Sequence, residues 1–147
     1  VEPGRYLVAD STILLTNVHS IKKGPVKYVG IDAGMNTLLR PALYDAYHHV
    51  VNASRLNSRS NESVNICGQI CENTDILAKN RKIGNVKEGD LLAILNVGAY
   101  GFSMSSQYNT RPRAAEVMIN KKYSKIIRQR ETINDLIKGQ KVVTWFK

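Results

Sequence analysis

The feature that most constrains the fold is a series of short apolar or alternating runs separated by glycine, asparagine, aspartate and serine. Several runs are rich in β-branched residues, which suit half-buried pleated strands. Many short strands with turn residues between them are typical of an antiparallel β domain. The sequence therefore predicts a mainly β fold, with strands at residues 13–18, 27–31, 47–51, 63–67, 90–95, 114–119 and 123–128.

Only a few segments are expected to be helical, and they are short. Residues 6–11 predict a connecting turn or helix, residues 37–46 a helix with Pro41 near its start, and residues 132–138 a terminal helix. Proline is tolerated in a first helical turn because its missing N–H has no partner there in any case. The polar, aperiodic stretch 54–62 predicts a loop.

The basic charge of the chain raises the question of a nucleic-acid partner. The formal net charge is +9 over 147 residues, and clustered lysine and arginine are the usual footprint of phosphate-backbone binding. Here the basic residues are spread between Lys22 and Lys147, and the densest run, 121–130, fits a strand pair with a solvated polar face. No helix-turn-helix, zinc-finger or RNP-like pattern accompanies them. We therefore expect no nucleic-acid partner.

Membrane and metal partners are also not expected. No stretch approaches the roughly 20 apolar residues of a membrane span, and no signal-peptide pattern is present, so the sequence predicts a cytoplasmic protein. Cys67 and Cys71 are the only cysteines, and nothing nearby completes a four-ligand metal set. A disulfide is not expected in a reducing compartment. His48 and His49 alternate across a predicted strand, cannot share a ligand on one face, and are interpreted as packing residues.

The first motif that carries chemistry is Glu2-Pro3-Gly4-Arg5. Glycine lets backbone N–H groups approach an anion, and proline stiffens the turn. The planar guanidinium of arginine grips a carboxylate or a phosphate at two points. A surface turn before a helix is the alternative interpretation.

The second motif places Arg40 and Tyr44 in the predicted helix 37–46. Residues four apart lie on the same helix face, so a guanidinium and a phenol would converge on one ligand. The alternative is an arginine stacked on a tyrosine at a helix surface.

The third motif is Gly68-Gln69-Ile70-Cys71-Glu72, which sets a thiol beside a carboxylate. Cys71 is a candidate proton donor, and Glu72 a candidate partner for a cationic group. The alternative is an inert buried cysteine next to a surface acid. Cys67 lacks the acidic neighbour and is interpreted as structural.

The fourth motif brackets Tyr100 between Gly98 and Gly101, directly after an apolar run. Two glycines allow a tight turn from which the phenol projects. Plain core packing of this ring is the alternative interpretation.

Taken in order, the four motifs resemble the diaminopimelate decarboxylases, a family of fold type III pyridoxal-phosphate enzymes. The resemblance runs from Glu2 to about Leu136 and leaves out the tail 137–147. It implies a Greek-key β-barrel domain of the alanine-racemase and decarboxylase C-terminal type, with a few short helices. The N-terminal TIM barrel of the family, with the lysine that binds the cofactor, is absent from this chain, which begins with Val1, so we expect a fragment.

The resemblance also implies a division of the chain and a cofactor site. Residues 1–22 would be the end of the barrel domain and a connecting segment, and residues 23–147 the C-terminal β-barrel domain. The cofactor is pyridoxal 5'-phosphate. Its binding residues would be Glu2, Pro3, Gly4, Arg5 and Tyr100.

Substrate binding and catalysis follow from the same resemblance. The family pattern assigns Cys71 as the proton donor to the carbanion left after carbon dioxide departs. Glu72 would hold the distal ammonium of the substrate. Arg40 would hold the distal carboxylate, with further substrate contacts from Arg5, Tyr44 and Tyr100.

The implied function is decarboxylation of meso-2,6-diaminopimelate to L-lysine and carbon dioxide, the last step of lysine biosynthesis. The implied assembly is a homodimer with shared active sites, in which the Cys71 and Glu72 motif reaches the partner subunit's site. We expect the isolated fragment to be inactive. Two alternatives stay open: a related ornithine, arginine or carboxynorspermidine decarboxylase, and a non-catalytic β domain that serves as a binding or dimerisation module.

Overall fold

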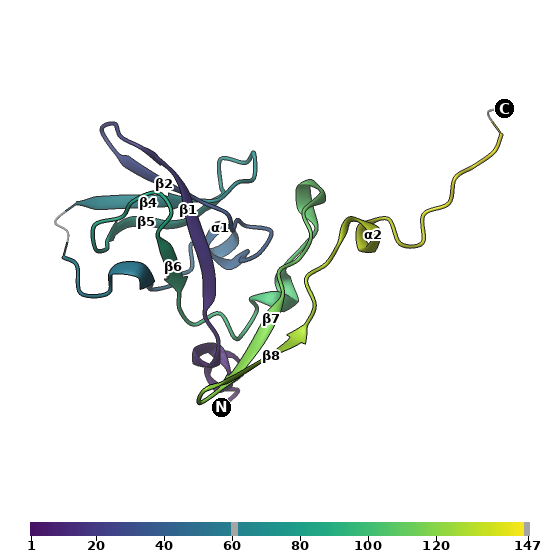
Figure 1. The fold of residues 1–147 in the computed structure, drawn as a ribbon, viewed down its shortest axis with the longest axis horizontal. Coiled ribbons are helices and arrows are strands. Elements are labelled where there is room, and N and C mark those ends of the chain that lie inside the picture. The colour runs from purple at the N-terminus through teal and green to yellow at the C-terminus, as the bar shows by residue number, and fades with distance from the viewer. Residues whose placement is uncertain (60–61, 146–147) are drawn as a thin grey trace. The chain divides into compact units, whose positions relative to one another are not determined.

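The structure, a computed structural model, describes residues 1–59 and 62–145. The chain divides into two compact units, residues 1–105 and residues 106–147, and each is described by itself (Figure 1). Residues 60 and 61 of the predicted loop and residues 146 and 147 of the tail lie outside the described part. Within the described part, no helix is long and apolar enough to cross a membrane.

The first unit is built on one mixed sheet, in which β1 lies between β2 and β6 (Figure 1). The strand order across the sheet is β3-β6-β1-β2-β4-β5. Its strands are β1 (Leu14–Lys22), β2 (Lys27–Ile31), β3 (Val50–Asn52), β4 (Ser63–Cys67), β5 (Ile76–Lys82) and β6 (Leu91–Ile94).

Strand β1 curves the sheet because its two halves pair with different strands. The first half pairs with β6, from Leu14 opposite Ile94 onward, and the second half pairs with β2, from Val18 opposite Ile31 onward. The register shifts between Val18 and Ser20, and such bulges bend and twist a strand. The sheet therefore curls around its apolar face as a barrel does, and the mainly β prediction is confirmed.

The core fills the inside of this curled sheet. Alternation along the strands sends every second side chain inward, and β1 shows it, with Thr16 and Val18 buried between exposed neighbours. The buried apolar cluster consists of Val18, Val29, Ile31, Ala33, Leu38, Val50, Val64, Ile66, Leu77, Ala78, Ile83, Val86, Leu92, Ile94 and Val97.

One group of hydrogen bonds, centred on the exposed Asp32, holds β1 beside β2. Asp32 accepts hydrogen bonds from the Thr16 hydroxyl (2.5 Å) and from the Asn17 backbone N–H (2.8 Å). Burial raises the pKa of Asp32, but these hydrogen bonds outweigh burial and keep the pKa below its ordinary value. Asp32 therefore ties β1 to the end of β2.

Three sequence predictions about the strands need correction. The sheet is not purely antiparallel, because β2 and β4 pair in parallel. Strand β5 was not expected, since its second half is basic and Asn80 takes a left-handed φ of 51°. The strand predicted at 47–51 begins only at Val50, and residues 45–49 are an irregular segment.

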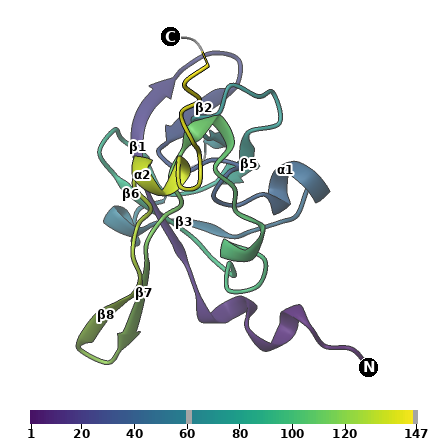
Figure 2. The same cartoon turned by 90° about the vertical axis from the view of Figure 1, so that its right-hand side faces the viewer.

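The first unit also contains short helical turns, and α1 lies at one side of the strands (Figure 2). The α-helix α1 has proline in its first turn, as expected, but is shorter than predicted because Asp45 ends it in a left-handed conformation. The predicted turn at 6–11 is confirmed as two consecutive 3₁₀ turns. The elements are η1 (Arg5–Leu7), η2 (Ala9–Ser11), α1 (Arg40–Tyr44), η3 (Ala53–Arg55) and η4 (Phe102–Met104).

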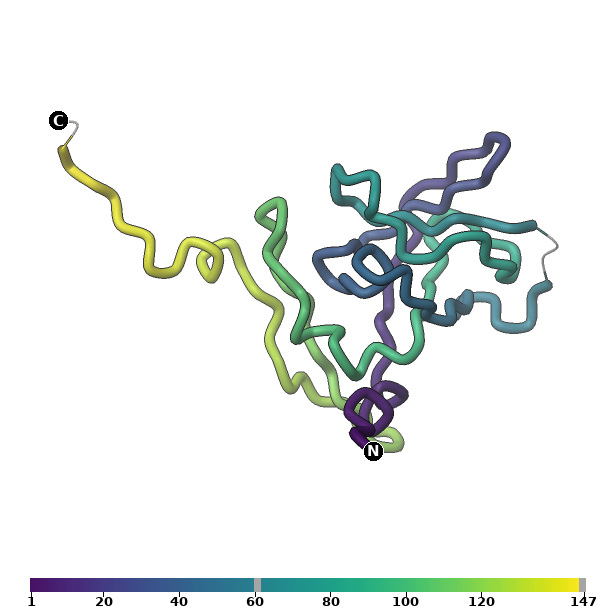
Figure 3. Tube along the Cα trace, turned by 180° about the vertical axis from the view of Figure 1, so that it is seen from behind, coloured from purple at the N-terminus to yellow at the C-terminus, as the bar shows by residue number. Residues whose placement is uncertain are grey.

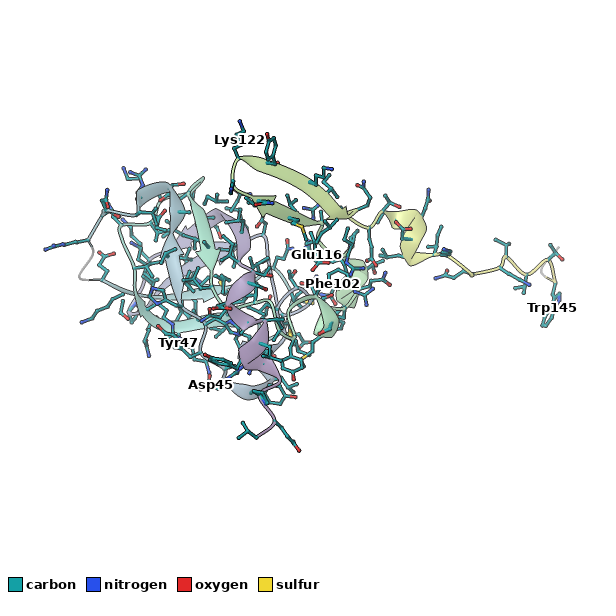
Figure 4. The ribbon with its side chains drawn as sticks, turned by 90° about the horizontal axis from the view of Figure 1, so that it is seen from below. Asp45, Tyr47, Phe102, Glu116, Lys122 and Trp145 are labelled. Carbon is teal, nitrogen blue, oxygen red and sulfur yellow. The ribbon has the colours of Figure 1, made fainter. Side chains whose placement is uncertain are left out.

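The second unit contains a β-hairpin and a short helix. Lys122 lies at the turn of the hairpin (Figure 4). The predicted strand at 123–128 is confirmed, the one at 114–119 begins two residues later, and the helix predicted at 132–138 is shorter. The elements are η5 (Tyr108–Thr110), β7 (Glu116–Asn120), β8 (Tyr123–Arg128) and α2 (Ile133–Leu136).

Candidate functional site

The candidate site is assembled on the segment 95–101, which leaves β6. Its backbone N–H groups donate hydrogen bonds to the residue just before β3, to the second N-terminal turn and to the residue that follows that turn. The Leu95 N–H donates to the His49 carbonyl (2.8 Å), the Val97 N–H to Thr12 (3.1 Å) and the Gly98 N–H to Ala9 (3.0 Å). The tube view follows these turns into the long strand β1 (Figure 3). Motifs that are distant in sequence therefore meet along one short segment.

Gly98 is required by the close approach of the N-terminal turns. A Cβ at this position would overlap the Val8 carbonyl oxygen and would lie 2.6 Å from the Ser11 hydroxyl. Only glycine lets the turn that begins at Val8 pack so tightly against this segment. The glycine before Tyr100 thus fixes where the first motif lies relative to the fourth.

Tyr100 lies at the centre of the site. Its φ of 61° is in the left-handed region, which is costly for a residue with a bulky side chain and clusters at ligand sites. The residue is 47% exposed, so the phenol is accessible at the surface of this unit. A Cβ built on Gly4 would lie 3.8 Å from its hydroxyl oxygen, which places the first motif beside Tyr100.

The Arg40 guanidinium lies over the Tyr100 ring, with its central carbon 5.9 Å from the ring centroid. A cation over an aromatic face is held by the ring quadrupole. Tyr44 lies at the other end of the same helix, 62% exposed. Of the two interpretations of this helix, a surface stack on Tyr44 is not what the structure shows for Arg40, because the ring beneath it is Tyr100.

His48 is buried at the same place, with 1% of its surface exposed. Its Nδ1 lies 3.0 Å from the Leu95 carbonyl oxygen. Burial lowers the pKa of His48, against the effect of the Leu95 hydrogen bond, and the charges of Arg40 and Arg5 lower it further.

Cys71 and Glu72 lie elsewhere in the unit, in the loop between β4 and β5, and both are exposed. The loop is organised by Asp75, which is 2% exposed. The Asp75 carboxylate accepts hydrogen bonds from the backbone N–H groups of Met35 (2.6 Å) and Ile70 (2.7 Å). A buried carboxylate with backbone donors on both oxygens is a strong local anchor.

Sequence reasoning missed Asp75 as the residue that shapes this loop. In the fold, Gly34 and Gly68 make room for Asp75, since a Cβ on Gly68 would lie 2.5 Å from the Gly34 Cα and 2.6 Å from Asp75 Oδ1. Two glycines packed around one carboxylate cannot be recognised as partners without the fold.

The two cysteines differ in their surroundings. Cys67 is half-buried on β4, where its thiol contacts the Val29 carbonyl oxygen (3.7 Å), and burial raises its pKa. Cys71 is exposed. Exposure gives Cys71 the access that a proton donor to a bound substrate needs. In the described part of the chain, His, Cys, Asp and Glu form no group of three that could hold a metal ion.

Comparison with known proteins decides the family. Residues 5–98 match the family described as the pyridoxal-dependent decarboxylase C-terminal sheet domain. The chain belongs to this family. The curved six-stranded sheet described above is thus the C-terminal sheet domain of a pyridoxal-dependent decarboxylase, and the predicted fold class is confirmed.

Individual relatives show how far the similarity extends. The chain is 50% identical over 142 residues to the diaminopimelate decarboxylase of Methanothermobacter thermautotrophicus, covering 97% of this chain and 33% of the relative. It is 46% identical over 145 residues to that of Archaeoglobus fulgidus, covering 99% and 35%. The crystal structure of the M. jannaschii diaminopimelate decarboxylase in co-complex with L-lysine superposes with a TM-score of 0.88 at 46% identity, covering 95% and 32%. The chain spans about a third of the length of these relatives.

The first motif fits the phosphate of the pyridoxal cofactor in a specific way. The Gly4 N–H donates to the Glu2 carbonyl (2.9 Å), so it closes the turn itself. The Tyr100 hydroxyl oxygen lies next to this turn, 3.8 Å from where a Cβ on Gly4 would stand, and Arg5 is the next residue along the chain. A cation and a neutral donor beside a side-chain-free residue suit a phosphate.

Proposed function

We propose that the chain is the C-terminal part of a diaminopimelate decarboxylase that converts meso-2,6-diaminopimelate to L-lysine and carbon dioxide. The observation that carries the proposal is the position of the Arg40 guanidinium over the Tyr100 ring. The hydroxyl of the same ring lies beside Gly4 of the first motif, so a cation that can bind a distal carboxylate and the turn proposed for the cofactor phosphate meet at one residue. Identity of 46–50% to curated diaminopimelate decarboxylases over nearly the whole chain supports the same substrate.

The distal end of the substrate is bound by charged side chains of this chain in this proposal. Arg40 holds the distal carboxylate, and its position over the Tyr100 ring limits the directions that the guanidinium can take. Tyr44, four residues later on α1, adds a phenol hydroxyl from the same helix. Glu72 holds the distal ammonium, which completes the recognition of an amino-acid head group.

The reacting end of the substrate lies by the cofactor. Bound pyridoxal phosphate supplies an electron sink for the bond that breaks as carbon dioxide leaves. Arg5 and Tyr100 hold its phosphate against the turn at Glu2-Pro3-Gly4. The Cys71 thiol delivers a proton to the substrate carbon that loses its carboxylate, and Asp75 keeps the loop that carries Cys71 in place.

The partner is a second copy of the same subunit, and the enzyme works in the cytoplasm. The exposure of Cys71 and Glu72 on a loop fixed by the buried Asp75 supports a role for both residues at a site on a partner subunit. A homodimer with shared active sites uses this arrangement directly.

The ornithine-type alternative is less well supported. A substrate with one carboxylate gives Arg40 no distal carboxylate to hold. The non-catalytic alternative gives no role to the strained backbone of Tyr100 (φ 61°) or to the stacking of Arg40 on its ring.

The experiment compares Arg40→Ala with wild type in the full-length enzyme, on diaminopimelate and on L-lysine as substrates. Loss of the grip on a desolvated carboxylate should lower kcat/KM for diaminopimelate about 30-fold or more. The poor activity on L-lysine should change little. An equal loss on both substrates would show that Arg40 does not read the distal carboxylate.

A further inference from the structure

A small cavity lies between the end of α1 and strand β5, and the proposed decarboxylation does not use it. Its wall combines apolar residues, among them Ala46 and Leu77, with the charged residues Asp45, Lys79 and Arg81. The cavity volume is about 220 Å³, below the roughly 300 to 1,000 Å³ of pockets for drug-sized ligands. Only a small ligand therefore fits.

The Arg81 guanidinium is the group in this wall that is best prepared to bind a ligand. Its central carbon lies 4.1 Å from the centroid of the Tyr47 ring, and the Tyr47 hydroxyl lies 3.1 Å from His49 Nδ1. Figure 4 shows Tyr47 near Asp45 at one edge of the first unit. Stacking on an aromatic ring limits the orientations of a planar guanidinium. Arg81 is therefore oriented before a ligand binds.

Arg81 lacks an anionic partner within the described part of the chain. The ion pairs found there use other cations, and the buried Arg81 Nε has no hydrogen-bond partner among the described residues. A buried donor without a partner carries a desolvation cost, and native structures rarely keep one without a reason. The planar fork of arginine matches the two oxygens of a carboxylate.

The other two charges of the wall leave this cation uncompensated. Lys79 and Asp45 form an ion pair (2.9 Å) in which both side chains are more than half exposed. Lys79 therefore offsets the repulsion that Asp45 exerts on an entering anion. Two cations and one carboxylate leave a single positive charge in the wall, which suits a monoanion, and the apolar residues suit a short hydrocarbon chain.

We propose that this cavity binds a small monocarboxylate, with its carboxylate on Arg81 and its short aliphatic chain against the apolar part of the wall. Neither Arg81 nor Tyr47 takes part in the proposed decarboxylation, so the site is independent of that function.

The test uses the full-length enzyme and butyrate, at constant ionic strength. Calorimetry should show one butyrate per subunit bound by this cavity, with a Kd on the order of 1 mM. Butylammonium has the same hydrocarbon chain with the opposite charge and should not bind. Arg40→Ala should leave butyrate affinity in the cavity within about twofold of wild type, which separates this site from the candidate site at Tyr100.

Two substitutions remove the two halves of the proposed site. Arg81→Gln removes the cation, and Ala46→Leu fills part of the cavity without changing any charge. Each should weaken butyrate binding about 10-fold or more. Lys82→Gln is the matched control, because Lys82 is an exposed cation on the same strand that does not line the cavity. Its butyrate affinity should stay within about twofold of wild type, and melting temperatures show that each variant is folded.

Three results would overturn the proposal. Equal losses in Lys82→Gln and Arg81→Gln would show attraction by the overall positive charge alone. Unchanged binding in Arg81→Gln would place the bound carboxylate elsewhere. A wild type that binds no butyrate would show that the cavity takes no free carboxylate in the complete enzyme.

Discussion

At the scale of single residues, close packing around glycines fixes the two parts of the candidate site, the turn at Tyr100 and the loop that carries Cys71. Gly98 admits the N-terminal turns next to Tyr100, and Gly68 admits the Asp75 carboxylate under the loop that carries Cys71. In both places a side-chain-free position lets a reactive residue stand at a fixed point. Substitutions that add or remove one or two heavy atoms at these positions should therefore change stability or activity measurably.

Gly68→Ala should destabilise the fold by about 2 to 4 kcal/mol, because the new methyl group would clash with the Gly34 backbone and with Asp75. Chemical denaturation of the full-length enzyme measures the change. Gly24→Ala is the control, since its Cβ would meet nothing closer than 3.7 Å. Equal stability of the two variants would show that the loop does not pack as described.

Cys71→Ala should lower kcat on the order of 10² to 10⁴-fold with little change in KM, because a proton donor acts in the transition state. Steady-state kinetics on diaminopimelate provides the measurement. Cys67→Ala is the matched control, as Cys67 is half-buried on β4 and away from the acidic neighbour of Cys71. A kcat within a few-fold of wild type for Cys71→Ala would transfer the proton-donor role to another residue.

At the scale of elements, the stability of the first unit depends on side-chain hydrogen bonds that link neighbouring strands and turns. Asp90, buried just before β6, accepts hydrogen bonds from Asn52 (2.9 Å), from the Lys87 N–H (2.9 Å) and from Arg55 (3.1 Å). It therefore links β6 to β3 and η3. Burial raises the pKa of Asp90, but these hydrogen bonds together hold it below the ordinary value of 3.8.

The hydrogen-bonded Asp90 carboxylate makes the free energy of unfolding depend on pH in a defined direction. Because the folded pKa of Asp90 lies below the unfolded value, its contribution is fully present above about pH 4 and is lost as the pH falls through the folded pKa. Asp90→Asn should cost about 1 to 3 kcal/mol at pH 7. Denaturation at several pH values should show the difference from wild type shrinking below pH 4. A difference that stays constant to pH 2 would contradict this account.

How far the sequence predicted these elements depends on the kind of signal involved. Alternation and β-branched residues located β2, β4 and β8 at their true bounds, because those signals are local. The parallel pairing of β2 with β4 depends on contacts between distant segments and has no local signal. Strand β5 was missed because Lys79, Asn80 and Arg81 interrupt its apolar pattern.

The candidate site was predicted to a similar degree. The four motifs named chemically reactive residues, and the structure brings Gly4, Arg40 and Tyr100 together. Asp75 was not found, since its role arises from burial and from backbone donors that only the fold supplies. The boundary between residues 22 and 23 stays a prediction.

At the scale of the whole molecule, the chain corresponds to about a third of the diaminopimelate decarboxylases that it resembles. The candidate site residues in the first unit include no group assigned to anchor the cofactor covalently. The proposal therefore places the complete reaction in the full-length enzyme.

The isolated chain of 147 residues should show no decarboxylase activity with added pyridoxal phosphate, and should bind that cofactor weakly. A covalent anchor and most of a phosphate cradle are expected from the remainder of the enzyme. Assays for carbon dioxide release and absorbance titration with the cofactor measure both properties. Robust turnover by this chain alone would refute the division of labour proposed here.

The central claim is tested most directly by the substrate preference of the full-length enzyme with pyridoxal phosphate. It should release L-lysine and carbon dioxide in equal amounts from meso-2,6-diaminopimelate. Its kcat/KM for ornithine or L-lysine should be lower by about 30-fold or more, because neither offers Arg40 a second carboxylate. Failure to form L-lysine, or a preference for ornithine, would contradict the claim that this chain completes a diaminopimelate decarboxylase.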